Sequence, residues 1–124
     1  EVSFYFGSGP TLTPHANAGR LRLLASTGSK RSQFNPGLPT VSETVPGHES
    51  TQWFGILAPA GISKDIVSKL HAAIATAART PKVVEQFAAV GSESIGNTPG
   101  EFAAFIKAEI TKWGKVVKSG VSLE

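Results

Sequence analysis

Hydrophobic residues follow one pattern in the first half of the chain and another in the second. In the first half they gather in three compact runs, residues 2–6, 21–26 and 51–58, each followed within two positions by glycine or proline. These runs are rich in aromatic, β-branched and other large apolar residues, and runs of this kind predict short strands buried in a sheet. From residue 62 onward, apolar residues recur instead at helical spacing. The two patterns together predict an α/β fold.

A glycine-rich turn connects the first two runs to each other through a short helix. Residues 7–10 read Gly-Ser-Gly-Pro, and Pro10 can lie in the first turn of a helix through residues 11–18, because no N–H is needed there. Gly19 suits the position just after such a helix, and Pro14 predicts that the helix is short. Strand, turn, helix and strand in this order predict a βαβ unit.

Residues 27–48 lose regular periodicity and read mostly as a loop. Within them, Thr40 and Glu43 have the spacing of a capping box, which predicts a one-turn helix. A short extended piece is expected at residues 93–95.

Three helices are predicted in the second half, each with a clear start signal. Ser63 can cap the first, and Thr80-Pro81 opens the second, which ends at Gly91. The third has the strongest signal, with Thr98 as N-cap, proline next and Glu101 at the third helical position. The first helix carries an apolar stripe of Ile66, Val67, Leu70, Ile74 and Ala77; the second is expected to bury Val84, Phe87 and Ala88; the third presents Phe102, Phe105, Ile106, Ile110, Trp113 and Val117. Trp113 is expected in the core, and the third stripe needs a partner surface.

Composition removes several classes of function. The 124 residues include no cysteine, so thiolate catalysis, disulfides and cysteine-based metal sites are excluded. No apolar run approaches the roughly 20 residues that cross a bilayer. The net charge of +3 favours anionic partners weakly, but no nucleic-acid-binding signature accompanies it, and Lys112, Lys115 and Lys118 read as a solvated helix face. No signal peptide leads these residues, and residues 123–124 resemble a vector scar.

The most suggestive feature for binding is the turn from residue 7 to residue 12. A glycine turn between a strand and a helix presents backbone N–H groups at the positive helix end, where carboxylate or phosphate binds. Ser8 and Thr11 can add hydroxyl donors, and Gly9 would let a ligand approach the backbone. A plain turn without a ligand is an equally good interpretation of the same residues.

Catalysis and metal binding find little support. Ser8 does not lie in a nucleophile elbow, and the only imidazoles, His15, His48 and His71, read as surface or packing residues. Metal-ligand pairs at helical spacing do not occur, and no cofactor motif is present. We therefore expect no catalytic residue, no metal and no cofactor, while an esterase using Ser8 and a histidine is a distant alternative.

Four stretches in series resemble the Bug solute receptors, the tripartite tricarboxylate transporter receptor (TctC-like) family. Residues 18–25 are similar to its Ala-Gly-Lys-Leu-Arg-x-Leu-Ala strand, and residues 38–43 to its Val-Pro-Thr-x-x-Glu turn. Residues 53–61 are similar to its Trp-x-Gly-x-x-Ala-Pro-Ala-Gly segment, and Thr98 to Phe102 with Lys112-Trp113 to its closing helix. At Gly7 the sequence departs from the family, in which aspartate or asparagine is common.

The resemblance implies part of a type II periplasmic-binding-protein fold, a βαβ unit, a crossover strand and C-terminal helices. Residues 1–50 would be the later part of the second ligand-binding lobe, 51–61 the crossover between lobes, and 62–122 helices that pack on the first lobe. The resemblance also implies a ligand site at which the glycine-rich loop after the first strand meets the end of the second strand. The residues of this site would be Ser8, Gly9, Pro10, Thr11, Leu12, Ser26 and Thr27.

By the same resemblance, the protein would be a periplasmic receptor and not an enzyme. It would capture a small organic carboxylate and deliver it to the membrane permease subunits of a transporter. The alternative is a standalone interaction domain with no ligand of its own, which forms a homo-oligomer through the exposed stripe of the last helix.

Overall fold

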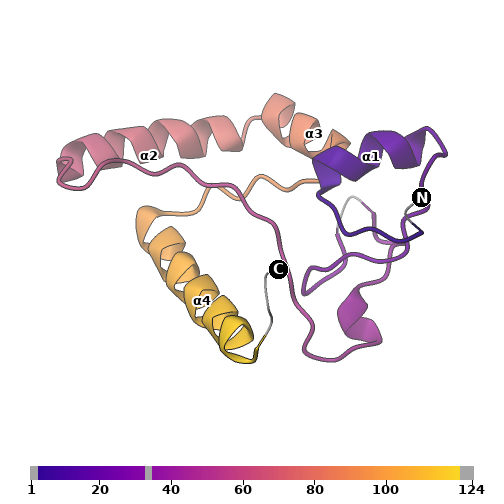
Figure 1. Ribbon diagram of the computed structural model, residues 1–124. Coiled ribbons are helices and arrows are strands. Elements are labelled where there is room, and N and C mark those ends of the chain that lie inside the picture. The colour runs from indigo at the N-terminus through magenta and orange to yellow at the C-terminus, as the bar shows by residue number, and fades with distance from the viewer. Residues whose placement is uncertain (1–2, 33–34, 121–124) are drawn as a thin grey trace. The chain divides into compact units, whose positions relative to one another are not determined.

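The computed structural model describes residues 3–32 and 35–120, and the chain clusters into two units (Figure 1). The first unit holds the described residues up to Pro59 together with Thr80–Ser94, and contains α1 (Gly9–Asn17), the 3₁₀ turn η1 (Val41–Glu43) and α3 (Pro81–Ala89). The second holds Ala60–Arg79 and the described residues from Ile95 onward, and contains α2 (Lys64–Ala78) and α4 (Pro99–Lys118).

The two helices of the first unit begin and end where the sequence signals place them. Proline lies in the first turn of both α1 and α3, where its missing N–H removes no helical hydrogen bond. Gly19 after α1 and Gly91 after α3 have φ of 69° and 70°, the left-handed conformation that glycine adopts without a steric penalty. The predicted bounds of these helices are confirmed within two residues.

The helices of the second unit begin at side-chain caps. The hydroxyl of Ser63 accepts a hydrogen bond from the N–H of Ile66 at 3.3 Å. At the start of α4, Thr98 Oγ1 accepts from the Glu101 N–H at 3.2 Å, and Glu101 Oε2 accepts from the Thr98 N–H at 2.8 Å. This reciprocal pair is the capping box that the sequence predicted.

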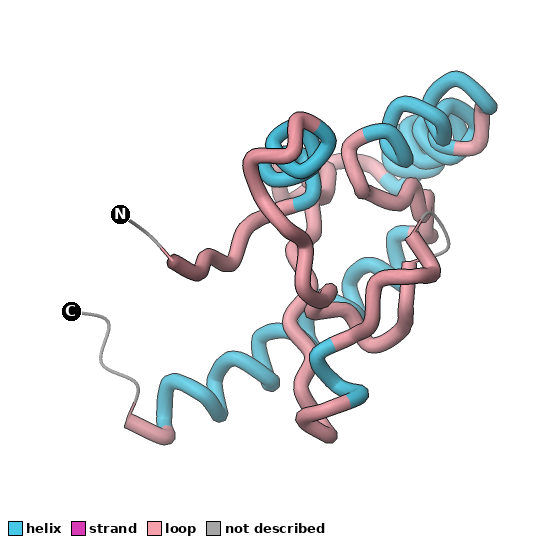
Figure 2. Tube along the Cα trace, turned by 90° about the vertical axis from the view of Figure 1, so that its right-hand side faces the viewer, coloured by secondary structure: helices cyan, strands magenta, loops and turns pink. Residues whose placement is uncertain are grey.

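The predicted strands form no ladder, and this expectation is wrong for the part of the chain that the structure describes (Figure 2). The single β-bridge there is parallel and joins Ser26 to Thr40. A strand is stable only when its N–H and C=O groups pair with a neighbouring strand. The helix of the predicted βαβ unit is present and lies between the two apolar runs along the chain. In the described ranges these two runs do not pair with each other.

Burial is sparse in both units. Ala75 is the single buried apolar side chain among the described residues. Contrary to expectation, Trp113 is 43% exposed and Phe87 is also 43% exposed. The stripe of α4 likewise leaves Ile110 at 69% and Val117 at 62% exposure. Apolar periodicity fixes which face of a helix is hydrophobic, but burial also requires a second surface to cover that face.

Candidate functional site

The turn into α1 holds two hydroxyl groups side by side. Ser8 has an extended backbone, with φ of −76° and ψ of 154°, and is the N-cap of α1. Its side-chain Oγ lies 2.8 Å from Thr11 Oγ1, within hydrogen-bonding distance. Its carbonyl oxygen accepts from the N–H groups of Thr11 at 3.1 Å and Leu12 at 2.9 Å. The structure therefore brings Ser8 and Thr11 together as the sequence predicted.

This arrangement limits which donors an anion could use. Pro10 has no N–H, and the amides of Thr11 and Leu12 already donate to the Ser8 carbonyl. The remaining donors are the Gly9 N–H and the hydroxyl hydrogen that the Ser8 and Thr11 pair does not use internally. Both donors lie at the positive end of a nine-residue helix, which favours negative charge.

Gly9 has a packing role that the sequence did not reveal. A Cβ at this position would lie 2.7 Å from the carbonyl oxygens of both Val90 and Gly91, which follow α3. In turn, a Cβ at Gly91 would lie 3.0 Å from Thr13 Oγ1. Gly9 is thus required for close backbone contact with the end of α3, and the proposed approach of a ligand is not needed to explain it.

Gly7 is also crowded, in this case by an aromatic ring. A Cβ at Gly7 would lie 2.6 Å from Tyr5 Cε1 and 3.0 Å from Leu12 Cγ. Tyr5 therefore occupies the space that a longer side chain at position 7 would need. The departure from the family pattern at this position coincides with a bulky neighbour two residues earlier.

Ser26 and Thr27 lie at a crossing of three backbone segments. The Ser26 N–H donates to the Pro39 carbonyl, and the Ser26 carbonyl accepts from the Val41 N–H, both at 2.9 Å. The Thr27 carbonyl accepts from the Ser50 N–H at 2.9 Å. Ser26 Oγ is buried and makes no hydrogen bond within the described residues, so it keeps its full capacity to donate and accept.

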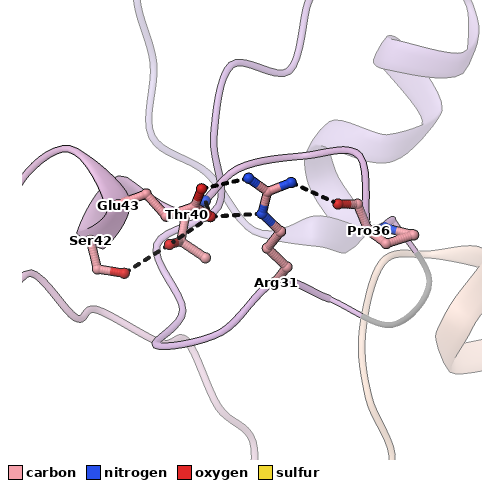
Figure 3. Close-up of polar contacts among 5 residues, drawn as sticks. All are labelled: Arg31, Pro36, Thr40, Ser42 and Glu43. Carbon is pink, nitrogen blue, oxygen red and sulfur yellow. Dashed lines mark hydrogen bonds and ion pairs between the residues drawn. The ribbon is translucent and has the colours of Figure 1, made fainter.

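An ion pair that sequence reasoning missed closes the loop beside this crossing (Figure 3). Arg31 Nε donates to Glu43 Oε1 at 2.7 Å, its Nη2 pairs with Glu43 Oε2, and its Nη1 donates to the Pro36 carbonyl at 3.1 Å. Glu43 Oε1 also accepts from the Thr40 N–H at 2.9 Å. The hydrogen bond from Arg31, followed by that from Thr40, lowers the pKa of Glu43 to about 2. The Thr-x-x-Glu spacing was the one sequence signal that pointed to Glu43.

Of the two groups of predicted site residues, the α1 turn contributes Leu12 to an apolar hollow, whereas Ser26 and Thr27 are not among the residues that line it. The hollow has a volume of about 310 Å³, and Leu12 and Ala25 both line it. No hydrogen bond connects the residues of the α1 turn to Ser26 or Thr27 in the described ranges. The wall is completed by Phe4, Tyr5, Phe6, Leu21, Arg22, Leu23, Leu24 and Val41.

A nucleophile paired with a base is not found in the described ranges. The Ser8 hydroxyl pairs with Thr11 and not with an imidazole, and His48 Nε2 is buried without a hydrogen bond. No group of three potential metal ligands occurs in the same ranges. None of the described helices is both long and apolar enough to span a membrane.

Comparison with known proteins places these features in a family. Residues 1–121 match the model of the tripartite tricarboxylate transporter family receptor. BugT of Bordetella pertussis is 36% identical over 110 residues, which are 88% of this chain and 34% of BugT. A UPF0065 protein of Pseudomonas sp. strain P51 is 34% identical over 102 residues, 81% of this chain and 30% of that protein. The chain spans about a third of the length of these relatives.

Two solved structures resemble the fold. An R. palustris protein with adipate matches with a TM-score of 0.76 and 35% identity, over 88% of this chain and 37% of its own. A structure described as a periplasmic transporter matches with a TM-score of 0.82 and 35% identity, over 93% of this chain and 39% of its own. The helices and open runs described above are therefore part of a periplasmic-binding-protein fold.

Proposed function

Because this chain belongs to the tripartite tricarboxylate transporter receptor family, we propose that it forms part of a periplasmic receptor for a small carboxylated metabolite. The observation that carries the proposal is the pair of hydroxyls of Ser8 and Thr11, 2.8 Å apart at the N-terminus of α1. A carboxylate at this point would accept from the Gly9 N–H and from one hydroxyl, and would face the positive end of the helix.

The buried hydroxyl of Ser26 supports a second contact with the ligand or with a water bound to it. A buried hydroxyl without a partner costs about 1–3 kcal/mol, and a ligand oxygen would remove that cost. Leu12 and Ala25 line the same hollow, and Ser26 follows Ala25 directly. We assign Ser8, Gly9, Thr11 and Ser26 as contact residues, with Pro10, Leu12 and Thr27 shaping the wall.

The class of ligand follows from the chemistry of the site and from the adipate that one similar structure holds. Hydroxyls and one helix N-terminus suit a single carboxylate without supplying a fixed counter-charge. A dicarboxylate would require a second set of donors, which we place in the part of the family fold that this chain does not span. Closure of two lobes would then hold the ligand until it reaches the permease subunits of the transporter.

The lobe assignment is part of the same proposal. Residues 1–50 would belong to the second lobe, 51–61 would cross between lobes, and 62–122 would pack on the first lobe. Such a receptor binds and releases its ligand unchanged, which agrees with a Ser8 hydroxyl that pairs with Thr11 and not with a histidine. The competing proposal, a homo-oligomer built on α4, draws on the exposure of Ile110 and Val117.

Isothermal titration with a panel of dicarboxylates, adipate included, tests the proposal. The chain alone should give little heat, because it supplies one side of the cleft. A fusion in which this chain replaces the matching third of BugT should give clear heat. Changing Ser8 to alanine and Thr11 to valine in the fusion should weaken binding about ten- to hundredfold, the effect of losing a hydrogen bond to a charged group. Tight binding by the chain alone would contradict the proposal that it supplies only one side of the cleft.

A further inference from the structure

Helix α3 belongs to the first unit although its neighbours along the chain do not. Residues Ala60–Arg79 before it and the described residues from Ile95 after it belong to the second unit, whereas Thr80–Ser94 cluster with the first. Packing, and not chain continuity, therefore holds α3 in the unit that contains the α1 turn. In the proposed lobe assignment, α3 would remain with the second lobe while α2 and α4 pack on the first.

The end of α3 has a closed hydrogen-bonding pattern. The Gly91 N–H donates to the Ala88 carbonyl and the Ser92 N–H to the Phe87 carbonyl, both at 2.9 Å, and Gly91 has a φ of 70°. Two such hydrogen bonds around a left-handed glycine form the Schellman motif, which satisfies the last carbonyls of a helix. In the described ranges, the carbonyls of Val90 and Gly91 accept no backbone hydrogen bond, and the motif fixes where they point.

These two carbonyls lie against the start of α1 (Figure 1). A Cβ at Gly9 would lie 2.7 Å from the oxygens of both Val90 and Gly91. In the other direction, a Cβ at Gly91 would lie 3.0 Å from Thr13 Oγ1 and 3.5 Å from Gly9 Cα. The two glycines therefore pack backbone to backbone, with no flexible side chain between them. A shift of the end of α3 would be transmitted directly to Gly9.

Gly9 lies at the centre of the proposed carboxylate site. Its N–H is one of the donors, and the hydroxyl oxygens of Ser8 and Thr11 lie 2.8 Å apart in the same turn. The side of Gly9 on which a side chain would project is filled by two carbonyl oxygens, which carry partial negative charge. A carboxylate must therefore reach the turn from another side, and the end of α3 sets the direction in which the donors face.

We propose that Gly91 is a positioning residue for the carboxylate site, and that it sets the orientation of the turn from Ser8 to Thr11 through Gly9 without touching the ligand. Binding groups must be held within about 0.5 Å of their productive geometry, so a contact that displaces this turn should weaken binding. The inference rests on the proposed function and adds a residue more than 80 positions from the turn to those that determine affinity.

Gly91→Ala and Gly19→Ala form a matched pair of variants. Gly19 ends α1 in the same motif with a φ of 69°, but a Cβ there meets no described atom within 4 Å. Both variants carry the same left-handed strain, and Gly91→Ala alone adds a contact with Thr13 and Gly9. Asparagine tolerates the left-handed conformation, so Gly91→Asn adds that contact with less strain and replaces Gly91→Ala if the latter does not fold.

Amide NMR of the chain and isothermal titration of the BugT fusion with adipate test the proposal. The amides of Gly9 and Thr11 should shift in the Gly91 variants and stay in place in Gly19→Ala. In the fusion, the Gly91 variants should weaken adipate binding about tenfold, the effect of impairing one hydrogen bond to a charged group, and Gly19→Ala should not. Turn amides that stay in place, or that shift equally in both variants, would overturn the proposal, as would unchanged affinity in the Gly91 variants.

A double-mutant cycle separates positioning from a general loss of stability. In a fusion that already carries Ser8→Ala and Thr11→Val, Gly91→Ala should cause no further loss of affinity, because the hydrogen bonds through which it acts are absent. An equal loss in both backgrounds would refute the positioning role.

The outcomes for the inference and for the proposed function are distinguishable. A parent fusion that gives no heat with any dicarboxylate would contradict the proposed function, while displaced turn amides in Gly91→Ala would still show that Gly91 positions the turn. Clear heat from the parent fusion, with turn amides unmoved in Gly91→Ala, would support the function and overturn the inference.

Discussion

The guanidinium group of Arg31 holds the carboxylate of Glu43 at two points, while the Thr40 N–H donates to the same carboxylate. This contact joins the two ends of the loop between residues 31 and 43, and Arg31 also donates to the Pro36 carbonyl inside that loop. A planar guanidinium donates to a carboxylate at two points at once, and the ammonium group of lysine would not reproduce this geometry. Thr40, which lies within this loop, forms the parallel β-bridge with Ser26.

The first prediction concerns the titration of Glu43. Arg31 and Thr40 lower its pKa from the usual 4.5 to about 2. A folded-state pKa below the unfolded one means that the contact stabilises the fold above about pH 4.5 and that this contribution disappears as the pH falls towards 2. Carbon NMR of the Glu43 carboxyl should show the low value, and Arg31→Met should raise it towards 4.5.

Glu101 provides the internal control for that titration. Its pKa is lowered by hydrogen bonds from the Thr98 backbone and side chain, which lie in the other unit and do not involve Arg31. Arg31→Met should therefore leave the Glu101 titration unchanged. An unchanged pKa of Glu43 in Arg31→Met would show that the pair does not form in solution.

The second prediction concerns the contact between Gly9 and the end of α3. Gly9→Ala places a methyl group 2.7 Å from two carbonyl oxygens, and overpacking of this kind costs about 1–3 kcal/mol. The N–H of Leu12 donates to the Ser8 carbonyl, and its hydrogen exchange should become faster by the factor that corresponds to this loss of stability. Gly100→Ala is the control, because a Cβ there has no atom within 4 Å and the helix should be unaffected or slightly more stable.

The third prediction concerns the capping box of α4. Thr98→Ala removes the hydroxyl that accepts from Glu101 N–H at 3.2 Å, and should destabilise the first turn by about 1 kcal/mol. Circular dichroism should record a loss of helix. NMR should show that this loss is confined to the start of α4. Thr111→Ala, which removes a hydroxyl bonded to the Lys107 carbonyl in mid-helix, should cause no loss.

The helices of this protein could be predicted from sequence because their signals are local. A cap such as Thr98 with Glu101, or a proline at the first turn, acts within four residues and needs no distant partner. The same reasoning singled out Ser8 and Thr11 as hydroxyl donors at one turn, and their hydroxyl oxygens lie 2.8 Å apart.

Features that depend on distant residues could not be predicted in this way. The runs at residues 2–6, 21–26 and 51–58 have strand-like composition, but a strand also requires a ladder of paired neighbours, and in the described ranges the one β-bridge is that of Ser26 with Thr40. Residues 1–2, in which the first run begins, and the suspected vector scar at 123–124 lie outside the described residues. Trp113 lies on an apolar stripe without a covering surface, and Gly9 is explained by Gly91, more than 80 residues away.

The fourth prediction concerns oligomerisation. If exposed apolar residues of α4 drive self-association, Ile110→Lys should convert a dimer to a monomer. If they await the remainder of the receptor fold, the chain should be a monomer at low concentration before and after this change. We expect the second result, which light scattering across a concentration series would establish, while a dimer broken by Ile110→Lys would favour the interaction-domain alternative.

The central claim is that the turn from Ser8 to Thr11 holds one carboxylate of the ligand, and amide NMR of the BugT fusion titrated with adipate tests it most directly. We predict saturable shifts at the amides of Gly9 and Thr11, lost in the variant with Ser8→Ala and Thr11→Val and retained in Thr111→Val. Saturable binding that leaves these two amides unmoved, or full affinity in the double variant, would contradict the claim.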